Sequence, residues 1–427
     1  MGTSDGTRGT AVSGRARYVT EIAALLWPPP RHVATGSGAG AGRPIREYLL
    51  VPHAREPRLM LPAAGRPGAT AVLGFNKDRS RKAGLLSRAL AIGLRTGVGA
   101  PLLRDRVRVY ESGPATDGTP PPAGDAAAPD IEGYLGRVLG ADVVIALHIG
   151  PDRANRKPVA QVLGRDGRTL GYAKIGVNEL TRELVRAERT ALEKLAKRPM
   201  PTVRVPSIAH AGQWNGLEIL VLDPLPVWSR HATLTRDRMM AAVAEVVEVD
   251  GVERLALTAS PYWESLRSRV TALGTGSGSG AGQEIATVLD RLAERAGDRV
   301  LPFGAWHGDW TAWNMAALPD QMLVWDWERF GTGVPVGFDA VHYVTQDAIT
   351  EGGADPRQAA DEGVAGAPEL LAPLGLTPDE ATLAALLYLA ELGTRYLTDR
   401  QDEAGARLGR LDTWLLPVLT SWSARVS

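Results

Sequence analysis

The chain is 427 residues long, which is enough for two or three domains. Lys plus Arg and Asp plus Glu are each 48, so the formal net charge is zero and the basic field expected of a nucleic-acid-binding protein is absent. The sequence has no cysteine, which excludes disulfides, thiolate metal sites and a cysteine nucleophile.

The hydropathy of the chain gives no sign of a membrane partner. No run approaches the roughly 18 apolar residues of a membrane helix. The N-terminus, GTSDGTRGTAVSG, is polar and lacks the pattern of a signal peptide. We therefore expect a cytoplasmic protein.

The first 42 residues are rich in Gly, Ser, Thr and Arg, which predicts a mostly disordered tail. Residues 43–140 are expected to form an α/β extension. Its role cannot be read from the sequence: it either extends a neighbouring sheet or forms a cap. Period-two and helical patterns in it predict strands at 47–53, 57–63, 69–75 and 106–112, and helices at 79–97 and 131–140.

Three consecutive strands are predicted where residues 141–226 begin, at 142–150, 158–164 and 169–176. The loop between the first two is not a GxGxxG loop and carries Arg153, Arg156 and Lys157. Either its backbone N–H groups and these cations contact a phosphate, or it is a solvated hairpin tip. The GxxxxGK[ST] signature is absent, so that class of nucleotide site is not expected.

Lys174 lies on the third of these strands, and the two-residue period places Leu170 and Tyr172 on the same side. In the helix that starts at Asn178, Glu188 falls near the middle of the apolar face. A carboxylate that faces the core is costly unless it is paired. Periodicity therefore predicts a Lys174–Glu188 ion pair, with a Lys174 that reaches solvent as the alternative.

Two more strands are predicted at 202–212 and 217–226, and the remainder, 227–427, is mainly helical. Its clearest helices are expected at 234–249, 260–274 and 283–297.

The densest group of polar residues lies between His307 and Glu328, in HGDWTAWN and WDWE. The apolar runs around them predict a strand, the loop 308–314, a short strand, a turn and a strand that ends at Asp326. A loop carboxylate, Asp309, can accept a hydroxyl proton. Asn314 and Asp326 offer the oxygen ligands that Mg²⁺ shares with phosphates. This set suits phosphoryl transfer from a nucleotide, while a tryptophan-rich core hairpin is the alternative.

The pattern HGDxxxxN followed by two hydrophobic residues and DWE resembles the aminoglycoside phosphotransferase and choline kinase-like family. Downstream, GVPVGFDAVHY resembles another segment of that family. The resemblance covers about residues 142–420 and is strongest at 306–339. It implies a two-lobed protein-kinase-like α+β fold, with a small antiparallel β lobe at 141–226, a large helical lobe at 227–427 and the N-terminal α/β extension before them.

The resemblance also implies roles for individual residues. Asp309 matches the catalytic base and His307 a residue that braces its loop, while Asn314 and Asp326 match the metal ligands and Asp339 an aspartate that holds the loop backbone. The resemblance implies nucleotide contacts for Lys174 as the strand lysine, for Glu188 as its helix glutamate, and for Val221 and Asp223 as the hinge between the lobes. Arg153 is added because it lies in the loop that is expected to cover the phosphates.

The function expected from these matches is phosphotransfer from ATP or GTP, with Mg²⁺, to a hydroxyl of a small molecule. The alternative is a catalytically silent nucleotide-binding module. In the family the last helices form the acceptor pocket, but here acidic residues alternate with arginines there, so the acceptor stays open. His148, His210, His231 and His342 lack metal-ligand spacing and are interpreted as structural or surface residues.

Overall fold

The structure is a computed structural model that describes residues 13–36, 43–63, 65–74, 81–98, 103–111, 130–151, 153, 155–274, 280–403 and 408–426. The chain divides into two compact units. The first, called the sheet unit below, comprises Met1–Asp152, Arg156–Val177 and Ala209–Pro224. The second, called the helical unit, comprises Arg153–Asn155, Asn178–Ile208 and Leu225–Ser427.

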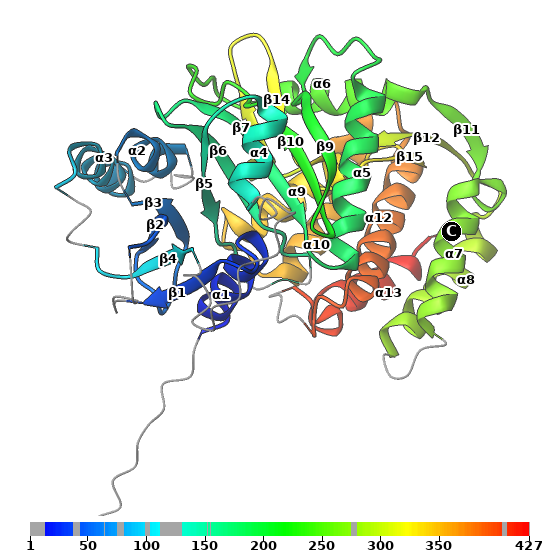
Figure 1. Cartoon of the computed structure of the whole chain (residues 1–427). Helices are drawn as coiled ribbons and strands as arrows, with labels where there is room; N and C mark the ends of the chain where they lie inside the picture. The colour runs from blue at the N-terminus through cyan, green and yellow to red at the C-terminus, as the bar shows by residue number, and fades with distance from the viewer. Residues whose placement is uncertain are drawn as a thin grey trace, which may run out of the picture. The chain divides into compact units, whose positions relative to one another are not determined.

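One large sheet dominates the sheet unit, and its described strands run in the order β1-β4-β2-β3-β5-β6-β7-β10-β9 (Figure 1). Leu59 and Met60 of β3 pair antiparallel with His148 and Leu147 of β5. The 43–140 segment therefore extends the sheet rather than capping it. The strand bounds are β1 His32–Gly36, β2 Arg46–Val51, β3 Leu59–Pro62, β4 Arg106–Tyr110, β5 Val143–His148, β6 Val159–Gly164, β7 Thr169–Gly176, β9 Ile208–Trp214 and β10 Leu217–Leu222.

Helices cover both faces of this sheet because its strands are apolar on both sides. One core joins α1 (Gly14–Leu26) and α4 (Ile131–Leu139) to alternate strand residues such as Ile145. A second core joins α2 (Gly65–Gly74) and α3 (Arg81–Thr96) to the intervening residues, such as Val144. The side-chain period of two sends neighbouring strand residues into opposite cores.

The N-terminal segment differs from the expected disordered tail, because residues 13–36 form α1 and β1. The Ser13 side chain caps α1 by accepting the Ala16 N–H at 3.2 Å. A helical stripe then buries Val19, Ile22 and Leu26. Burial of this stripe outweighs the polar composition around it. The rest of the expected tail lies outside the described residues.

The strand predicted at 69–75 is also wrong, because residues 65–74 form α2. Pro67 suits the first turn of a helix, and the small residues after it allow close packing: a Cβ at Gly68 would lie 2.5 Å from the Pro62 carbonyl oxygen. The helix predicted at 79–97 is present as α3, although two of its large apolar residues, Leu85 and Ile92, are exposed.

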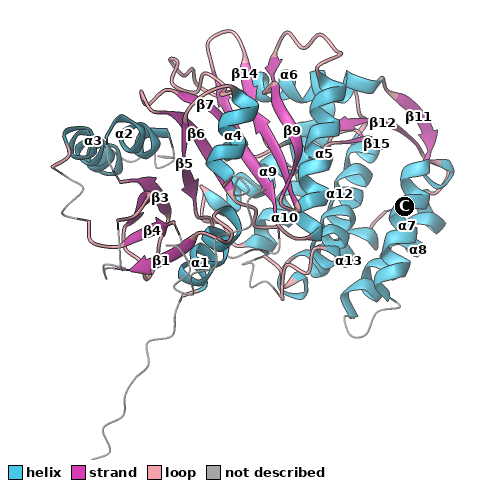
Figure 2. Ribbon diagram, viewed as in Figure 1, coloured by secondary structure: helices cyan, strands magenta, loops and turns pink. Residues whose placement is uncertain are grey.

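The helical unit has two small three-stranded sheets among many helices (Figure 2). One sheet has the order β11-β12-β15 and the other β13-β14-β8. Helix α12 is buried along most of its length and contacts α7, α8, α9 and α13. The bounds are α5 Glu179–Leu195, β8 Val203–Arg204, α6 Arg236–Val247, β11 Glu253–Ala256, α7 Pro261–Gly274, α8 Gly280–Ala296, β12 Val300–Trp306, β13 Met315–Ala317, β14 Met322–Val324, β15 Gly331–Pro335, α9 Phe338–Thr350, α10 Pro356–Ala365, α11 Ala367–Leu371, α12 Pro378–Thr398 and α13 Leu415–Ser423.

These two units confirm the predicted α+β class, with an antiparallel sheet in one and mainly helices in the other. Among the described residues, no single helix is long and apolar enough to cross a membrane. The segments Ala367–Leu374 and Pro378–Thr398 reach that length and composition only as a pair, which is bent by 106°.

Candidate active site

The turn that follows β12 presents the HGD motif, and α9 holds its backbone. Asp339, in the first turn of α9, accepts the N–H of His307 at 2.6 Å and that of Gly308 at 3.0 Å. Gly308 has a φ of +85°, and a Cβ there would lie 2.3 Å from the Arg329 carbonyl oxygen. Only glycine fits this position. The predicted contact between Asp339 and the loop backbone is confirmed.

His307 is fully buried and connects the turn to β14. Its Nε2–H donates to the Trp325 carbonyl at 3.1 Å, and its Nδ1 accepts the Asp309 N–H at 3.1 Å. These partners require the neutral ring with the proton on Nε2. Burial lowers the pKa of His307 to about 4, in keeping with that form. The expected bracing of the loop by His307 is therefore seen.

Asp309 projects from this turn, with 33% of its side chain exposed. The Asn314 amide nitrogen donates to the Asp309 Oδ2 at 2.9 Å and to the Asp309 carbonyl at 3.0 Å. Asn314 is brought there by the hairpin of β13 and β14, in which Met315 pairs with Val324. Since Asn314 uses its nitrogen toward Asp309, its amide oxygen is the atom that can bind a metal.

A third partner of Asp309 is His342 on α9, a residue for which the sequence predicts only a structural or surface role. The His342 Nε2 lies 3.2 Å from the Asp309 Oδ1, and its Nδ1 lies 2.8 Å from the Tyr388 hydroxyl. Burial lowers the pKa of His342, so the neutral ring donates to Asp309 and accepts from Tyr388. The signal for this contact was the spacing from Asp339, since residues three apart share one helix face.

The ionisation of Asp309 follows from these contacts. Burial raises its pKa, but the hydrogen bond from His342 and the charge of Arg395 outweigh burial and lower the pKa to about 2. Arg395, on α12, also donates a hydrogen bond to the Gly308 carbonyl. Asp309 is therefore a carboxylate at every pH at which enzymes ordinarily work.

A group of three carboxylates lies at the end of β14. Ligand atoms of Glu188, Asp326 and Glu328 all lie within 4.8 Å of one another, and Glu188 and Glu328 are buried. Asp326 has a left-handed backbone with φ 73° and ψ 53°, which is uncommon for a residue other than glycine and typical of functional sites. Carboxylate oxygens in such a group, with the amide oxygen of Asn314, are ligands that suit Mg²⁺.

Glu188 has a role within the helical unit that periodicity did not predict. Its Oε1 accepts the Trp327 N–H at 3.2 Å, so α5 supports the turn that carries Asp326 and Glu328. The predicted burial of Glu188 is confirmed, with none of the residue exposed. Lys174 belongs to the sheet unit, so its ion pair with Glu188 stays a prediction.

Lys174 itself lies on β7 and is 7% exposed. Ala173 and Ile175 pack into the core beneath α1 and α4, so alternation turns Lys174 to the other face. Leu170 packs with Ala173 and Ile175 rather than beside Lys174, because the pairing of β6 with β7 shifts register there. The prediction that Leu170 shares the side of Lys174 is wrong.

The other residues with expected nucleotide contacts lie on two elements. Val221 is buried in β10 and Asp223 is exposed just after it, both in the sheet unit. Arg153 is exposed in the loop after β5 and belongs to the helical unit. In the same loop, the guanidinium of Arg156 stacks on the Tyr18 ring, with 3.6 Å to the ring centre.

Comparisons with known proteins found no matching family model and no matching curated protein. Among solved structures, the chain is similar to a putative fructosamine-3-kinase from Thermobifida fusca YX-ER1, with 17% identity, a TM-score of 0.42, and coverage of 69% of this chain and 98% of that one. It is similar to a thermostable mutant of the aminoglycoside phosphotransferase APH(4)-Ia, with 14% identity, a TM-score of 0.43 and coverage of 69% and 98%. It is also similar to a choline kinase from Streptococcus pneumoniae, with 12% identity, a TM-score of 0.42 and coverage of 69% and 98%.

Proposed function

We propose that this chain is a phosphotransferase that moves the γ-phosphate of ATP or GTP to a hydroxyl of a small molecule such as an antibiotic, a sugar or an amino alcohol. The observation that carries the proposal is the Asp309 carboxylate. It is one-third exposed, it is oriented by Asn314 and His342, and it lies on a turn that Asp339 clamps through two backbone bonds. Such a constellation positions a reacting hydroxyl more than it activates one.

In this proposal Asp309 accepts the proton of the acceptor hydroxyl. The acceptor oxygen forms a bond to the γ-phosphorus, the bond from that phosphorus to the bridging oxygen of the nucleotide breaks, and the nucleoside diphosphate leaves with the electron pair. Asp309 is ionised, so it can take the proton as the oxygen loses it. His307 acts through the backbone, since its ring holds the Asp309 N–H and Trp325 carbonyl.

We assign a Mg²⁺ site to Asn314 and Asp326, and the oxygens present fit that ion. When bound there, Mg²⁺ would neutralise charge on the transferred phosphates. Glu328 and Glu188 lie within reach of Asp326 and add negative charge to the site.

The remaining nucleotide contacts are proposed from the resemblance and from residue chemistry. Lys174 would neutralise the α- and β-phosphates, with Glu188 orienting it. Val221 and Asp223, at the end of β10, would supply backbone groups to the adenine edge. Arg153 would add a cation near the phosphates.

A silent nucleotide-binding module is the second candidate, and one observation favours it. The loop after β5 would have to cover the phosphates, yet Arg156 of that loop stacks on Tyr18 within its own unit. A module of this kind would bind Mg-ATP and release no ADP with any acceptor.

The test is ADP release by the purified protein with Mg-ATP and pooled hydroxylated acceptors, which include aminoglycosides, macrolides, sugars, amino alcohols and nucleosides. Asp309→Asn is expected to bind nucleotide normally and to lose acceptor-dependent release. Asp326→Ala is expected to lose Mg²⁺-dependent nucleotide binding. If both variants keep full affinity and full activity, the assignment of the site is wrong. Bound ATP without release for any acceptor favours the silent module.

A further inference from the structure

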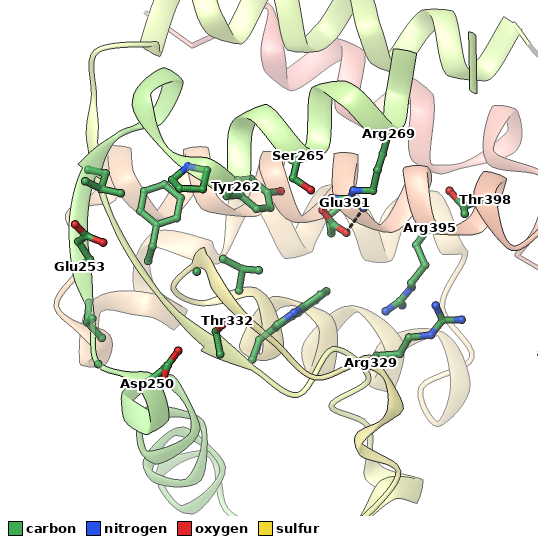
Figure 3. Close-up of a pocket in the computed structure, with 18 of the residues that line it drawn as sticks. Asp250, Glu253, Tyr262, Ser265, Arg269, Arg329, Thr332, Glu391, Arg395 and Thr398 are labelled. Carbon is green, nitrogen blue, oxygen red and sulfur yellow. Dashed lines mark hydrogen bonds and ion pairs between the residues drawn. The ribbon is translucent and has the colours of Figure 1, made fainter. Parts of the chain in front are cut away.

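One face of α12 carries three charged residues at intervals of four, Glu391, Arg395 and Asp399. All three line a pocket of about 760 Å³ within the helical unit, and Figure 3 shows Glu391 and Arg395 at its wall. Trp306, which precedes His307 in the chain, lines the same pocket. Side chains that border an open space lose packing partners there, so polar contacts carry more of the support for the elements around it.

Arg395 holds the peptide bond that precedes Asp309. It donates to the Gly308 carbonyl, and the N–H at the other end of this peptide bond, that of Asp309, donates to the His307 Nδ1 at 3.1 Å. A peptide unit is planar, so a hydrogen bond at each end fixes the orientation of the plane. Gly308 has a φ of +85° and no Cβ, so its own side chain opposes no rotation of that plane. These two hydrogen bonds therefore set the direction in which Asp309 leaves the turn.

The charge of Arg395 is engaged by the same turn. It acts against burial in setting the pKa values of Asp309 and Asp339, so the guanidinium lies near both carboxylates. A guanidinium has five N–H donors, and it can therefore bond a carbonyl while its charge balances neighbouring acids. Arg395 thus combines a hydrogen bond to the turn backbone with the counter-charge for the turn's two acids.

Asp399 holds the residue that packs against Gly308 from another side. A Cβ on Gly308 would lie 2.3 Å from the Arg329 carbonyl oxygen, so the Arg329 backbone lies directly against this glycine. The Arg329 side chain forms an ion pair with Asp399, which is 6% exposed. Breaking a buried pair is costly, because the remaining charge loses its partner. Asp399 therefore fixes Arg329, and with it one boundary of the turn.

We propose that Arg395 and Asp399 are positioning residues of the catalytic turn. Arg395 fixes the peptide plane before Asp309, and Asp399 keeps the Arg329 backbone against Gly308. The inference rests on the proposed function for its catalytic meaning, and it adds two residues that act through the turn. Loss of Arg395 should lower the rate of transfer more than nucleotide binding, since the proposed metal and nucleotide contacts belong to other residues.

The same wall of the pocket supplies a matched control. Arg269 of α7 forms a two-bond ion pair with Glu391, with both distances 2.7 Å (Figure 3). This pair joins α7 to α12, whereas the bond of Arg395 joins α12 to the turn. Arg269→Met should therefore lower the melting temperature, as Arg395→Met does, and should leave the turn as it is.

Amide hydrogen exchange of the full chain, without nucleotide or acceptor, tests the inference independently of activity. In the peptide that contains His307 to Asp309, Arg395→Met should speed exchange about 10- to 100-fold, as for the loss of a hydrogen bond to a charged group. Arg395→Lys keeps the charge and a donor and should recover part of the protection. Asp399→Asn should have a smaller effect, because asparagine can still accept from Arg329. Arg269→Met should leave exchange in this peptide unchanged.

Activity is the second measurement, with Mg-ATP and a pooled acceptor that yields ADP. Arg395→Met is expected to lower kcat about 100-fold, as for a misplacement of roughly 1 Å, with little change in the KM for Mg-ATP. Arg395→Lys should restore part of kcat. A role in stability alone predicts losses in Arg395→Met and Arg269→Met that follow their melting temperatures.

The outcomes separate this inference from the proposed function. Equal exchange of the turn in Arg395→Met and Arg269→Met would overturn the inference, whatever the activity. Faster exchange only in the Arg395 and Asp399 variants supports it even when no acceptor yields ADP, and in that case only the proposed activity is contradicted. Where ADP is released, full kcat in Arg395→Met, or a loss that Arg269→Met shares, overturns the inference while the phosphotransferase stands. If Arg395→Met does not fold, Arg395→Lys and Asp399→Asn provide the same comparison.

Discussion

With a pKa of about 2, the Asp309 carboxylate is a weak base whose orientation is fixed by Asn314 and His342. A weak base suits a reaction in which the attacking oxygen loses its proton late and positioning dominates. The hydrogen bond from His342 has two effects that oppose each other. It lowers the basicity of Asp309, and it holds one carboxylate oxygen in place so that the other can face the acceptor.

Substitution of His342 should separate these effects. His342→Phe removes a hydrogen bond to a charged group, and such a bond contributes about 1.5–3 kcal/mol. The pKa of Asp309 should therefore rise by about one to two units. The acidic limb of the kcat/KM profile should move to higher pH by the same amount, and kcat should fall.

His342→Gln is the matched control, because its amide can still donate to Asp309. It should keep the acidic limb closer to that of the unsubstituted chain. A role for His342 in packing alone predicts the same pH profile in both variants, with any loss in activity independent of pH, and that result would contradict the assigned hydrogen bond.

The carboxylates of Asp326, Glu188 and Glu328 lie close together, and their mutual repulsion leads to a second prediction. Like charges at this separation repel, and asparagine tolerates a left-handed backbone as aspartate does. Asp326→Asn should therefore leave the metal-free melting temperature equal or higher. It should also remove the stabilisation that Mg²⁺ with nucleotide gives by mass action. Thermal melts with and without Mg-ATP measure both. A metal-free chain that melts much lower would argue against the repulsion.

Among the elements, the turn between β12 and the 3-10 helix at Ala312–Asn314 depends most on one glycine. Gly308→Ala should destabilise the helical unit by several kcal/mol: about 1–2 kcal/mol for the left-handed backbone, and more for the clash with the Arg329 carbonyl. Gly375→Ala is the control, because Gly375 has a φ of +78° with open space around it, so only the backbone cost applies. Urea unfolding of both variants gives the difference. Equal losses would show that the close approach to Arg329 is not a constraint.

Local patterns in the sequence predicted the elements that carry the site. The strand–loop–hairpin around HGDWTAWN and WDWE places Asp309, Asn314 and Asp326 as the structure has them, because apolar runs and a short turn fix a hairpin locally. The buried Glu188 was found the same way, from helical periodicity. Each of these patterns lies within a single helix or hairpin, so it can be recognised from a short stretch of sequence.

Partners that are distant along the chain could not be found in this way. Arg395 reaches the turn from α12 and Tyr388 of the same helix holds His342, and nothing in the local sequence of Arg395 or Tyr388 marks either as a neighbour of the site. For His342 the only local sign was its spacing from Asp339. The segments 13–36 and 65–74 were missed for another reason. Their composition is typical of a tail and of a strand, but burial against the sheet decides their structure.

At the scale of the whole molecule, the formal charge is zero, so local groups rather than net charge should set how stability changes with pH. Two buried groups at the turn act in opposite directions. Burial lowers the pKa of His307 to about 4, and burial raises the pKa of Asp339 to about 7 against its backbone hydrogen bonds.

Between pH 6.5 and 4.5 the unfolded chain binds a proton at His307 that the folded chain does not, which lowers stability as the pH falls. Over the same range the folded chain binds a proton at Asp339 that the unfolded chain does not, which raises stability as the pH falls. Asp339→Asn removes only the second effect. Its unfolding free energy should therefore drop more steeply with acid than that of the unsubstituted chain, by up to about 2.7 kcal/mol over these two pH units. Urea titrations at pH 6.5 and 4.5, followed by tryptophan fluorescence, measure this slope. Parallel slopes would show that Asp339 stays ionised in the folded chain.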